Sequence, residues 1–309
     1  MEFQQLRGFF YSVKLGNLTK AAEKMSVTQS AVSQQIKSLE DELGVKLFNR
    51  FGPRKDLTSD GKLFFNLISP VIQEIDALKV TFEDLKGNQR GQLTIAATTF
   101  MIMNQLPNII KKFTKIYPHV KLSILERRWN EIVSLAQLGE IDFGLAPISK
   151  VPPNLKFIKL DPIERVLITC LKHPLSKKKN VTLLDIAQYP MITYEKGLVS
   201  RDKIDHVFED LHLDVEIVME ATNSETIKKY VEMGIGIAVI PKIVLFPSQN
   251  RKLETISVNK HFGKSQYGII LRKGKHITTW AKNFLLMLAP ALKDQLEETA
   301  TSNESVENS

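Results

Sequence analysis

The stretch VTQSAVSQQIKSLEDELGVKLFNR, residues 27–50, decides the N-terminal fold. Its apolar residues recur at helical spacing, and Thr28 can cap the helix that they define. The apolar face of this helix consists of Ala31, Val32, Ile36, Leu39 and Leu43. The opposite face carries Gln29, Ser30, Ser33, Gln34 and Lys37. Such side chains can hydrogen-bond to base edges in the major groove of DNA, although any helix in a three-helix cluster also needs one polar face.

Two shorter helices are expected before this stretch. Residues 3–15 place Phe3, Leu6, Phe9, Phe10 and Val13 at helical spacing. Gly16 and Asn17 then end that helix and begin another, which carries Leu18, Ala21, Ala22 and Met25. The small alanines allow a neighbouring helix to approach closely. The pattern predicts a cluster in which residues 28–43 form the helix that faces outward.

A basic turn follows the cluster. Residues 49–55, NRFGPRK, combine glycine and proline with three cations, Arg50, Arg54 and Lys55. As a wing, this turn would contact phosphates or enter a narrowed minor groove. The alternative is a solvated basic turn without a partner.

From Ser59 to about Lys86 the sequence predicts one long helix. Its apolar residues alternate in steps of four and three: Phe64, Ile68, Val71, Ile75, Leu78, Phe82 and Leu85. This spacing is typical of a coiled-coil seam, although the helix could also lie on its own domain. Because no segment of the N-terminal part remains to cover it, we expect it to pair with a second chain, and we expect Pro70 to kink it. A two-fold dimer predicts an inverted-repeat DNA site.

The remainder of the chain reads as alternating strands and helices. A polar, glycine-flanked hinge at residues 87–91 precedes strands expected at 93–97, 120–126 and 141–146, with a helix at 106–116. A second block begins near residue 163, and a C-terminal helix at 278–292 returns to the first block. This alternation favours a parallel sheet covered on both faces. The chain would then cross from the first block to the second and back again, which would leave two lobes with a cleft between them.

Ligands of open α/β sheets bind outside the carboxyl ends of the strands, near helix N-termini. The residues at such positions are Thr98, Thr99, Pro147, Ile148, Thr193, Tyr194, Ser200, Arg201 and Asn223. We expect them to converge on an effector in the cleft. Taken one at a time, the hydroxyl and amide residues could simply be helix caps.

The composition and the motifs that are missing limit the classes of function that fit this chain. The net charge of +8 and the pI near 9.3 favour a polyanionic partner. The single cysteine, Cys170, reads as a buried strand residue rather than a reactive thiol, and the histidines lack metal-ligand spacing. No nucleophile elbow, phosphate loop or dinucleotide fingerprint is present, so we expect neither an enzyme nor a cofactor. Without an export signal or a long apolar run, we expect a cytoplasmic protein with no membrane partner, which disfavours a periplasmic-type transport receptor.

These N-terminal segments closely resemble the winged helix-turn-helix of LysR-type transcriptional regulators. The resemblance rests on residues 9–10 (FF), 18–23 (LTKAAE), 27–40, 43–50 (LGVKLFNR) and 57–61 (LTSDG). It implies that Thr28, Gln29, Ser30, Ser33, Gln34 and Lys37 face double-stranded DNA and that Arg50 and Arg54 belong to the wing. It also implies a homodimer or homotetramer and makes RNA polymerase a candidate partner.

The second half resembles the effector domain of the same family, at residues 93–96 (LTIA), 139–146 (GEIDFGLA) and 231–241 (VEMGIGIAVIP). Residues 191–194 (MITY) and 226–231 (TIKKYV) are similar to the branch that controls cysteine biosynthesis and sulfur assimilation. That branch has a further hydroxyl and an amide where this chain has Phe100 and Met101. The family often has a small hydroxyl residue where Arg128 and Trp129 stand here.

These departures suggest an effector larger or more apolar than an inorganic anion, with Arg128 or Arg201 available to its carboxylate or phosphate. Alternatively, Arg128 faces solvent and Trp129 packs in the core.

The sequence therefore predicts an α/β protein with a winged helix-turn-helix, a long linker helix and a two-lobed effector domain like a periplasmic binding protein. The expected bounds are 1–58 for DNA binding, 59–90 for the linker and dimerisation helix, and 91–295 for the effector domain. Within the effector domain, lobe I would comprise 91–161 and 265–295, and lobe II 162–264. Residues 296–309 read as a disordered tail.

Overall fold

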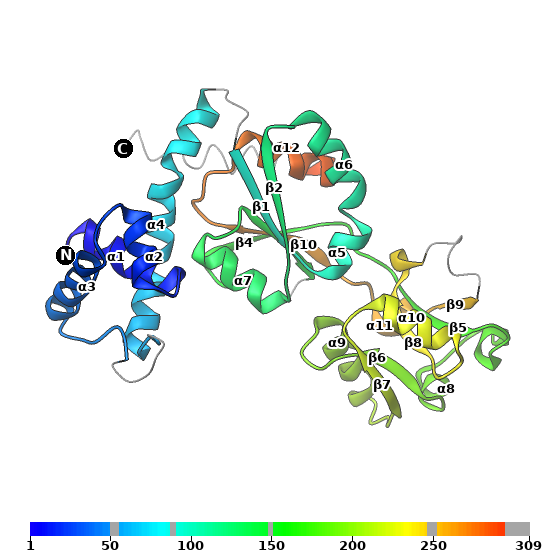
Figure 1. The fold of residues 1–309 in the computed structure, drawn as a ribbon. Coiled ribbons are helices and arrows are strands. Elements are labelled where there is room, and N and C mark those ends of the chain that lie inside the picture. The colour runs from blue at the N-terminus through cyan, green and yellow to red at the C-terminus, as the bar shows by residue number, and fades with distance from the viewer. Residues whose placement is uncertain (50–55, 87–90, 148–150, 246–251, 294–309) are drawn as a thin grey trace. The chain divides into compact units, whose positions relative to one another are not determined.

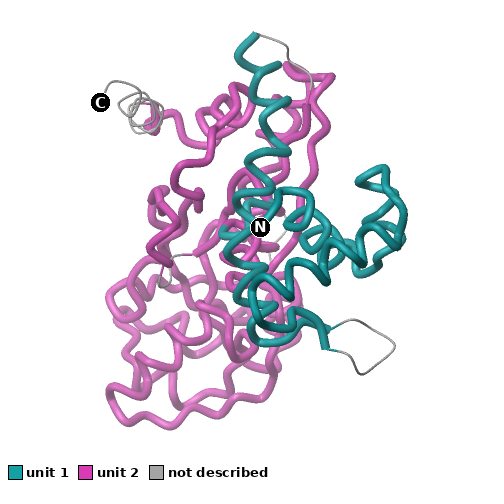
Figure 2. Tube along the Cα trace, turned by 90° about the vertical axis from the view of Figure 1, so that its left-hand side faces the viewer, with its two compact units in different colours: residues 1–88, 137–140 teal, residues 89–136, 141–309 magenta. Residues whose placement is uncertain are grey.

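The computed structural model describes residues 1–49, 56–86, 91–147, 151–245 and 252–293 (Figure 1). The chain divides into two compact units, residues 1–88 with 137–140 and residues 89–136 with 141–309 (Figure 2). We call them the N-terminal unit and the effector unit. Four sequence predictions fall outside the described residues: the wing at 50–55 with Arg50 and Arg54, the hinge at 87–90, Ile148, and the tail.

The N-terminal unit is helical. Its helices are α1 (Phe3–Lys14), α2 (Leu18–Met25), α3 (Gln29–Leu43) and α4 (Ser59–Leu85). Side-chain caps fix three of the starts, because Asn17, Thr28 and Thr58 each accept a backbone N–H from the first turn that follows. Gly44 ends α3 with a positive φ of 68°, a conformation that glycine adopts without the steric cost of a Cβ.

Aromatic side chains build the core of this unit. Phe9 and Phe10 of α1 are fully buried, and Phe9 meets Phe48 edge-on with ring centroids 5.4 Å apart. Val32 and Leu39 of α3 pack in the same cluster. An antiparallel bridge between Phe48 and Leu57 brackets the predicted wing. The helices of the cluster therefore hold both ends of the basic turn.

Helix α4 corrects part of the sequence prediction. Phe64 packs against the core, Ile68 is 7% exposed and Ile72 is fully buried among the residues of α1 and α3. One face of the first half of the helix is thus covered by its own unit, contrary to our expectation, because α1 turns its aromatic face toward it. The large apolar residues of α4 left exposed are Leu63, Leu67, Val71, Ile75, Leu78, Val80, Phe82 and Leu85.

Lobe I of the effector unit is built on a mixed sheet. Its strands are β1 (Gly91–Ala97), β2 (Val120–Glu126), β3 (Phe143–Pro147), β4 (Leu155–Lys159) and β10 (Tyr267–Arg272), in the order β2-β1-β3-β10-β4. Strands β1, β2 and β3 are parallel, as predicted, but β10 is antiparallel to both β3 and β4. The sequence pattern indicated only the three parallel strands and neither β4 nor β10, because alternating elements do not show that a late strand enters the sheet from the opposite end.

Helices cover both faces of this sheet (Figure 1). They are α5 (Thr99–Asn104), α6 (Pro107–Ile116), α7 (Trp129–Leu138), α12 (Thr279–Leu288) and the 3-10 turn η3 (Pro290–Leu292). Ile95 and Phe143 pack toward α6 and α12, whereas Ala96 packs toward α7. Thr98 follows the carboxyl end of β1, and Pro147 is the last residue of β3, so both lie at the same edge of the sheet.

Lobe II holds a second, smaller set of strands. They are β5 (Arg165–Cys170), β6 (Met191–Tyr194), β7 (Ile217–Ala221), β8 (Ala238–Pro241) and β9 (Leu253–Ser257). Strands β8, β5 and β9 pair antiparallel, β6 pairs parallel with β7, and a parallel bridge between Met191 and Ile237 joins the two groups. The helical segments are η1 (Pro174–Lys177), α8 (Leu183–Ala187), α9 (Val199–Glu209), α10 (Ser224–Glu232), η2 (Lys242–Val244) and α11 (Asn259–Phe262).

The chain passes between the lobes twice, and the two passages are paired. The N–H of Ile163 donates to the carbonyl of Ser265 at 2.8 Å, and the N–H of Ser265 donates back to Ile163 at 2.7 Å. Lobe II is therefore an insertion between β4 and β10 of lobe I. Within the described ranges, no helix has the length and apolar character needed to cross a membrane.

Candidate functional site

The outward face of α3 is the first candidate site. All six side chains predicted to face DNA are exposed: Thr28, Gln29, Ser30, Ser33, Gln34 and Lys37. The Thr28 hydroxyl accepts the N–H of Ala31 at 3.2 Å and lies 3.0 Å from the Ser30 hydroxyl, so these two residues also cap the helix. The remaining side chains on this face project from a rigid helix and are free to meet a partner.

The inward face of α3 fixes its position. Val32 and Ile36 are buried in the core, and the Ser38 hydroxyl accepts a hydrogen bond from Nε2 of Gln5 at 3.1 Å. Gly8 of α1 lies so close to α3 that a Cβ there would come within 2.8 Å of the Gln35 side chain. Glycine at this position lets α1 support α3 at short range.

Glu40, which sequence reasoning missed, holds the chain that leads to the wing. Its carboxylate accepts the N–H groups of Leu47 at 2.9 Å and Phe48 at 3.4 Å, and it pairs with Nζ of Lys46 at 2.8 Å. Partial burial alone would raise the pKa of Glu40, but these three donors hold it below its ordinary value. No local sequence signal identifies this contact, because a glutamate near the end of a helix is usually solvated.

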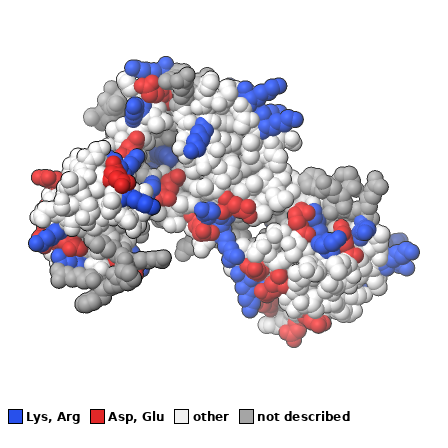
Figure 3. Space-filling model, viewed as in Figure 1, with Lys and Arg blue, Asp and Glu red and all other residues white. Residues whose placement is uncertain are grey.

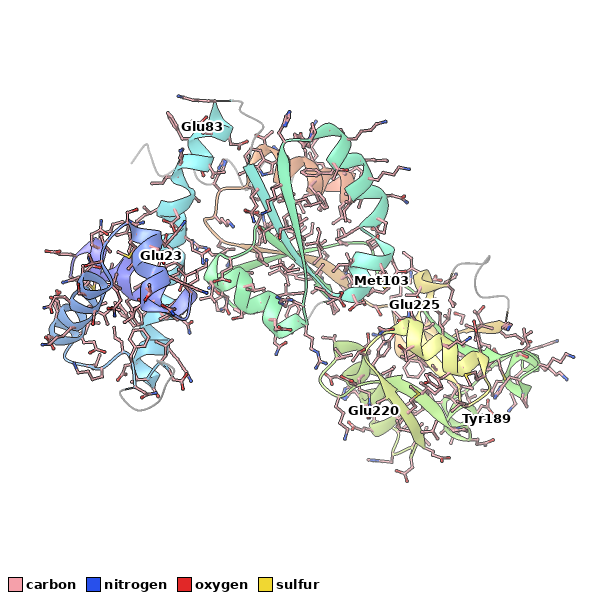
Figure 4. The ribbon with its side chains drawn as sticks, in the orientation of Figure 1. Glu23, Glu83, Met103, Tyr189, Glu220 and Glu225 are labelled. Atoms are coloured by element: carbon pink, nitrogen blue, oxygen red, sulfur yellow. The ribbon has the colours of Figure 1, made fainter. Side chains whose placement is uncertain are left out.

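The second candidate site is a cavity of about 400 Å³ between the two lobes of the effector unit. It is lined by eight of the eleven predicted effector-binding residues, namely Thr98, Thr99, Arg128, Trp129, Pro147, Tyr194, Ser200 and Asn223. Met103 of lobe I and Glu225 of lobe II also line it, and both lie where the lobes meet (Figure 4). The topology thus brings together residues as far apart in sequence as Thr98 and Asn223.

Several helices begin at this cavity. The first residues of α7, α9 and α10 contribute Trp129, Ser200 and Ser224 to its lining. The N-terminal turn of a helix presents unpaired N–H groups and a partial positive charge. The start of α9 has no side-chain cap, so its N–H groups are not satisfied by a cap of their own. The uncapped start of α9 therefore offers N–H donors to the cavity, which is also lined by the carboxylates of Glu126, Glu131 and Glu225.

Two arginines that line the cavity, Arg127 and Arg128, are in ion pairs. Nη2 of Arg128 in lobe I donates to Glu195 in lobe II at 3.1 Å, and Arg127 lies 3.8 Å from Glu131. Figure 3 shows acidic and basic side chains side by side near the junction of the lobes. The Arg128–Glu195 pair joins the lobes directly, although both side chains remain partly exposed.

Two predicted residues, Thr193 and Arg201, do not line the cavity. Thr193 is 2% exposed and its hydroxyl has no hydrogen-bond partner. Arg201 is 5% exposed, and it donates to Asp205 at 2.6 Å, to Glu220 at 2.6 Å and to the Tyr194 carbonyl at 2.8 Å. Burial alone would lower the pKa of Arg201, but the two carboxylates raise it. Arg201 thus fixes the backbone of a lining residue instead of facing the cavity.

Aromatic residues form the inner wall, and of these the sequence analysis had assigned only Tyr194 to the effector site. Phe100 stacks on Tyr267 with centroids 4.6 Å apart, and Tyr267 also hydrogen-bonds to Ser200 of the other lobe. The Tyr194 hydroxyl lies 2.7 Å from the Ser224 hydroxyl. Burial raises the pKa of Tyr194 to about 12 and raises that of Tyr267 as well. Both tyrosines are neutral at any physiological pH and act as hydrogen-bonding groups.

A helix-turn-helix with an exposed polar helix, followed by a two-lobed α/β unit with a cavity between its lobes, defines a ligand-responsive DNA-binding regulator. Comparison with family models gives the particular family. Residues 3–62 match the bacterial regulatory helix-turn-helix protein of the lysR family, and residues 86–293 match the LysR substrate binding domain. The chain belongs to the LysR family of transcriptional regulators, as the sequence resemblance indicated.

Full-length relatives agree with this assignment. The chain is 34% identical over 292 residues to the HTH-type transcriptional regulator CysB of Burkholderia cenocepacia, covering 94% of this chain and 93% of the relative. It is 33% identical over 298 residues to SsuR of the same organism, covering 95% and 96%. The sequence resemblance to the branch that contains CysB is thereby confirmed.

Solved structures show the same architecture. The cofactor-binding domain of the Cbl transcriptional regulator matches with a TM-score of 0.63 and 28% identity, covering 71% of this chain and 95% of that one. Full-length OxyR from Pseudomonas aeruginosa matches with a TM-score of 0.70 and 20% identity, covering 95% and 98%. At that identity, the second likeness supports the fold alone. Full-length CbnR in complex with its target DNA matches with a TM-score of 0.59 and 20% identity, covering 93% and 99%.

Proposed function

We propose that this regulator reads an inverted-repeat operator with the exposed face of α3. The observation that carries the proposal is the coincidence of all six DNA-facing positions on one exposed, polar face whose opposite side is locked into the core. Glutamine can pair bidentately with adenine, and Lys37 can reach guanine or phosphate. Two copies related by a two-fold axis would present two such helices to successive half-sites.

The exposed apolar face of α4 supports the dimer. Leu67, Val71, Leu78 and Phe82 are each at least half exposed, and they recur in steps of four and seven along one helix. Such a face is stabilised when a second helix covers it. A homodimer or homotetramer formed through α4 would set the spacing of the two recognition helices.

The cavity between the lobes is the proposed effector site. A small molecule that favours one arrangement of the lobes would shift the population of regulator conformations and thereby change operator binding or contact with RNA polymerase. In this proposal the protein acts in the cytoplasm as a regulator and not as an enzyme. It uses no metal or cofactor besides the effector. The residues with described positions include no cluster of His, Cys, Asp and Glu suited to a metal ion.

The test is binding of the full-length protein to its own upstream DNA and to a scrambled duplex, each over a range of salt concentrations. Gln29→Ala should remove the preference for the upstream DNA and leave the salt dependence nearly unchanged, because salt dependence reports phosphate contacts. Gln4→Ala, which removes an exposed glutamine of α1, is the matched control. Equal binding of the unmodified protein to both duplexes would contradict the proposal.

A further inference from the structure

A second cavity of the effector unit shares a wall with the proposed effector site. Its volume is about 730 Å³. Lobe I lines it through α5, the end of β4, the end of α12 and η3, and lobe II lines it through η2. The passage between the lobes, residues 160–164, forms another side. We call this cavity the rear groove, and the proposed function gives it no occupant.

Short elements from both lobes make up the shared wall. Helix α5 places Phe100 on the effector cavity and Met101 on the rear groove. Turn η2 likewise places Val244 on the effector cavity and Ile243 on the rear groove. Tyr267 lines both. A group that fills the rear groove therefore contacts the same elements that shape the effector cavity.

The lining of the rear groove is mostly apolar. Ile243 is 37% exposed there, although it is a large apolar residue. The other apolar residues along the groove include Met101, Leu160, Ile163, Leu245 and Leu288. Apolar surface of this kind is stabilised when another apolar group removes it from water.

Charge at the rear groove favours no particular sign. Of the four charged residues that line it, Lys242 and Glu164 pair with each other at 2.8 Å. The other two, Lys159 and Asp161, are opposite in sign and both exposed. A charged occupant would be attracted by one and repelled by the other. An apolar side chain should therefore decide what binds.

The chain itself supplies a segment at the edge of the groove. Leu292 lines the groove and is 4% exposed, and the described residues end directly after it, at Lys293. The tail segment, residues 294–309, has the sequence DQLEETATSNESVENS. Its two large apolar residues are Leu296 and Val306. A candidate occupant is thus attached to the groove by the backbone.

The length of this connection distinguishes the two apolar residues. Leu296 follows Leu292 by four residues, which span at most about 14 Å when fully extended. Val306 follows it by fourteen residues and is not confined in this way. A short tether gives an effective concentration in the millimolar range. A segment with a Kd of about 100 μM as a free peptide would therefore be roughly 90% bound on its own chain.

We propose that the tail segment docks on its own chain with Leu296 in the rear groove. Two observations carry this inference: the groove is apolar and spans both lobes, and a four-residue tether holds Leu296 at its edge. Docking would cover Ile243 and support the shared wall from the side opposite the effector. It would thereby favour one arrangement of the lobes. The inference depends neither on the proposed operator nor on the proposed effector.

The experiment compares the full-length protein with a chain that ends at Lys293. This shortening leaves the described core intact, because Leu292 is the last residue of that core. The probe is a fluorescein-labelled peptide of residues 294–309, and its fluorescence anisotropy reports binding. We expect saturable binding to the shortened chain. Binding to the full-length protein should be at least 10-fold weaker, because its own tail segment competes at millimolar effective concentration.

Two pairs of substitutions locate the contact. In the peptide, Leu296→Asp should abolish binding, whereas Val306→Asp should leave it nearly unchanged. In the shortened chain, Ile243→Asp should abolish binding. Its matched control is Ile235→Asp, because Ile235 is also an exposed isoleucine of lobe II, at 41%, and lies outside the groove. Thermal melting shows whether each protein variant is folded, and the peptide pair tests the same contact without altering the protein.

The peptide must bind the shortened chain for the proposal to stand. No saturable binding, or equal binding to the full-length and shortened chains, would overturn it. So would equal effects of Leu296→Asp and Val306→Asp. If the shortened chain changes its sedimenting mass and does not bind the peptide, a second copy covers the groove and the proposal is wrong. Operator discrimination is measured on the same samples, and its outcome bears on the operator proposal alone.

Discussion

Replacing Glu40 with alanine should loosen the segment that leads to the wing without unfolding α3. The carboxylate is the acceptor for the N–H groups of Leu47 and Phe48, and both residues are buried, at 0% and 8% exposure. An unsatisfied buried donor costs about 1–3 kcal/mol. Because the bond to Phe48 is long, at 3.4 Å, we take about 2–4 kcal/mol for the pair.

Hydrogen exchange of the full-length protein, followed by mass spectrometry, measures this effect locally. A local loss of about 2 kcal/mol corresponds to roughly 30-fold faster exchange at the two amides. The control is Asp41→Asn, because the neighbouring Asp41 carboxylate is 61% exposed and lies 3.8 Å from the same Lys46. A pair that exposed contributes about 0.5 kcal/mol or less, so its loss should leave the exchange almost unchanged.

Acidity should have the same effect as the substitution. The folded-state pKa of Glu40 lies below its ordinary value of 4.5. Its stabilising contribution is therefore complete above that value and is lost as the pH falls through the lowered folded pKa. Unchanged exchange at Leu47 and Phe48 in Glu40→Ala, or equal acceleration in Asp41→Asn, would refute the reasoning.

Three further changes test other parts of the molecule. Gly61→Ala should destabilise the N-terminal unit by about 2–4 kcal/mol, because a Cβ there would lie 2.0 Å from the Leu47 carbonyl oxygen. Thermal melting measures this loss, and an unchanged melting curve would contradict that contact. Leu67→Glu with Leu78→Glu should shift sedimentation toward monomer, whereas a face without a partner would tolerate both charges. A double-mutant cycle on Arg128 and Glu195 should give a coupling of about 0.2–1 kcal/mol in thermal melting, and no coupling would mean that the pair does not join the lobes in solution.

Local signals in the sequence located the helix starts well. Asn17 and Thr28 are followed by helices that begin at Leu18 and Gln29, because a capping side chain acts within its own turn. The polar face of α3 was equally readable, since helical spacing alone separates it from the core. These features depend on residues within a few positions of each other.

Features made by distant residues were not readable. Tyr267 reaches the cavity wall only because β10 enters the sheet of lobe I antiparallel to β3, and periodicity does not give the direction of strand pairing. The same limit applies to Phe64 and Ile68, whose spacing fits a coiled-coil seam as well as it fits packing on α1. Arg201 follows a strand, as expected of an effector-binding residue. Its guanidinium forms ion pairs with Asp205 and Glu220 instead of facing the cavity.

The paired passages at Ile163 and Ser265 have a mechanical consequence for the effector unit. Two independent tethers would let one lobe slide, twist or swing with similar ease. Here the reciprocal hydrogen bonds of 2.8 and 2.7 Å make the tethers a single ribbon. Bending that ribbon keeps both bonds, whereas sliding one passage along the other breaks them. The connection between the lobes therefore resists sliding more than it resists bending. A ligand bound between the lobes would change the angle between them more easily than it would shift one passage along the other.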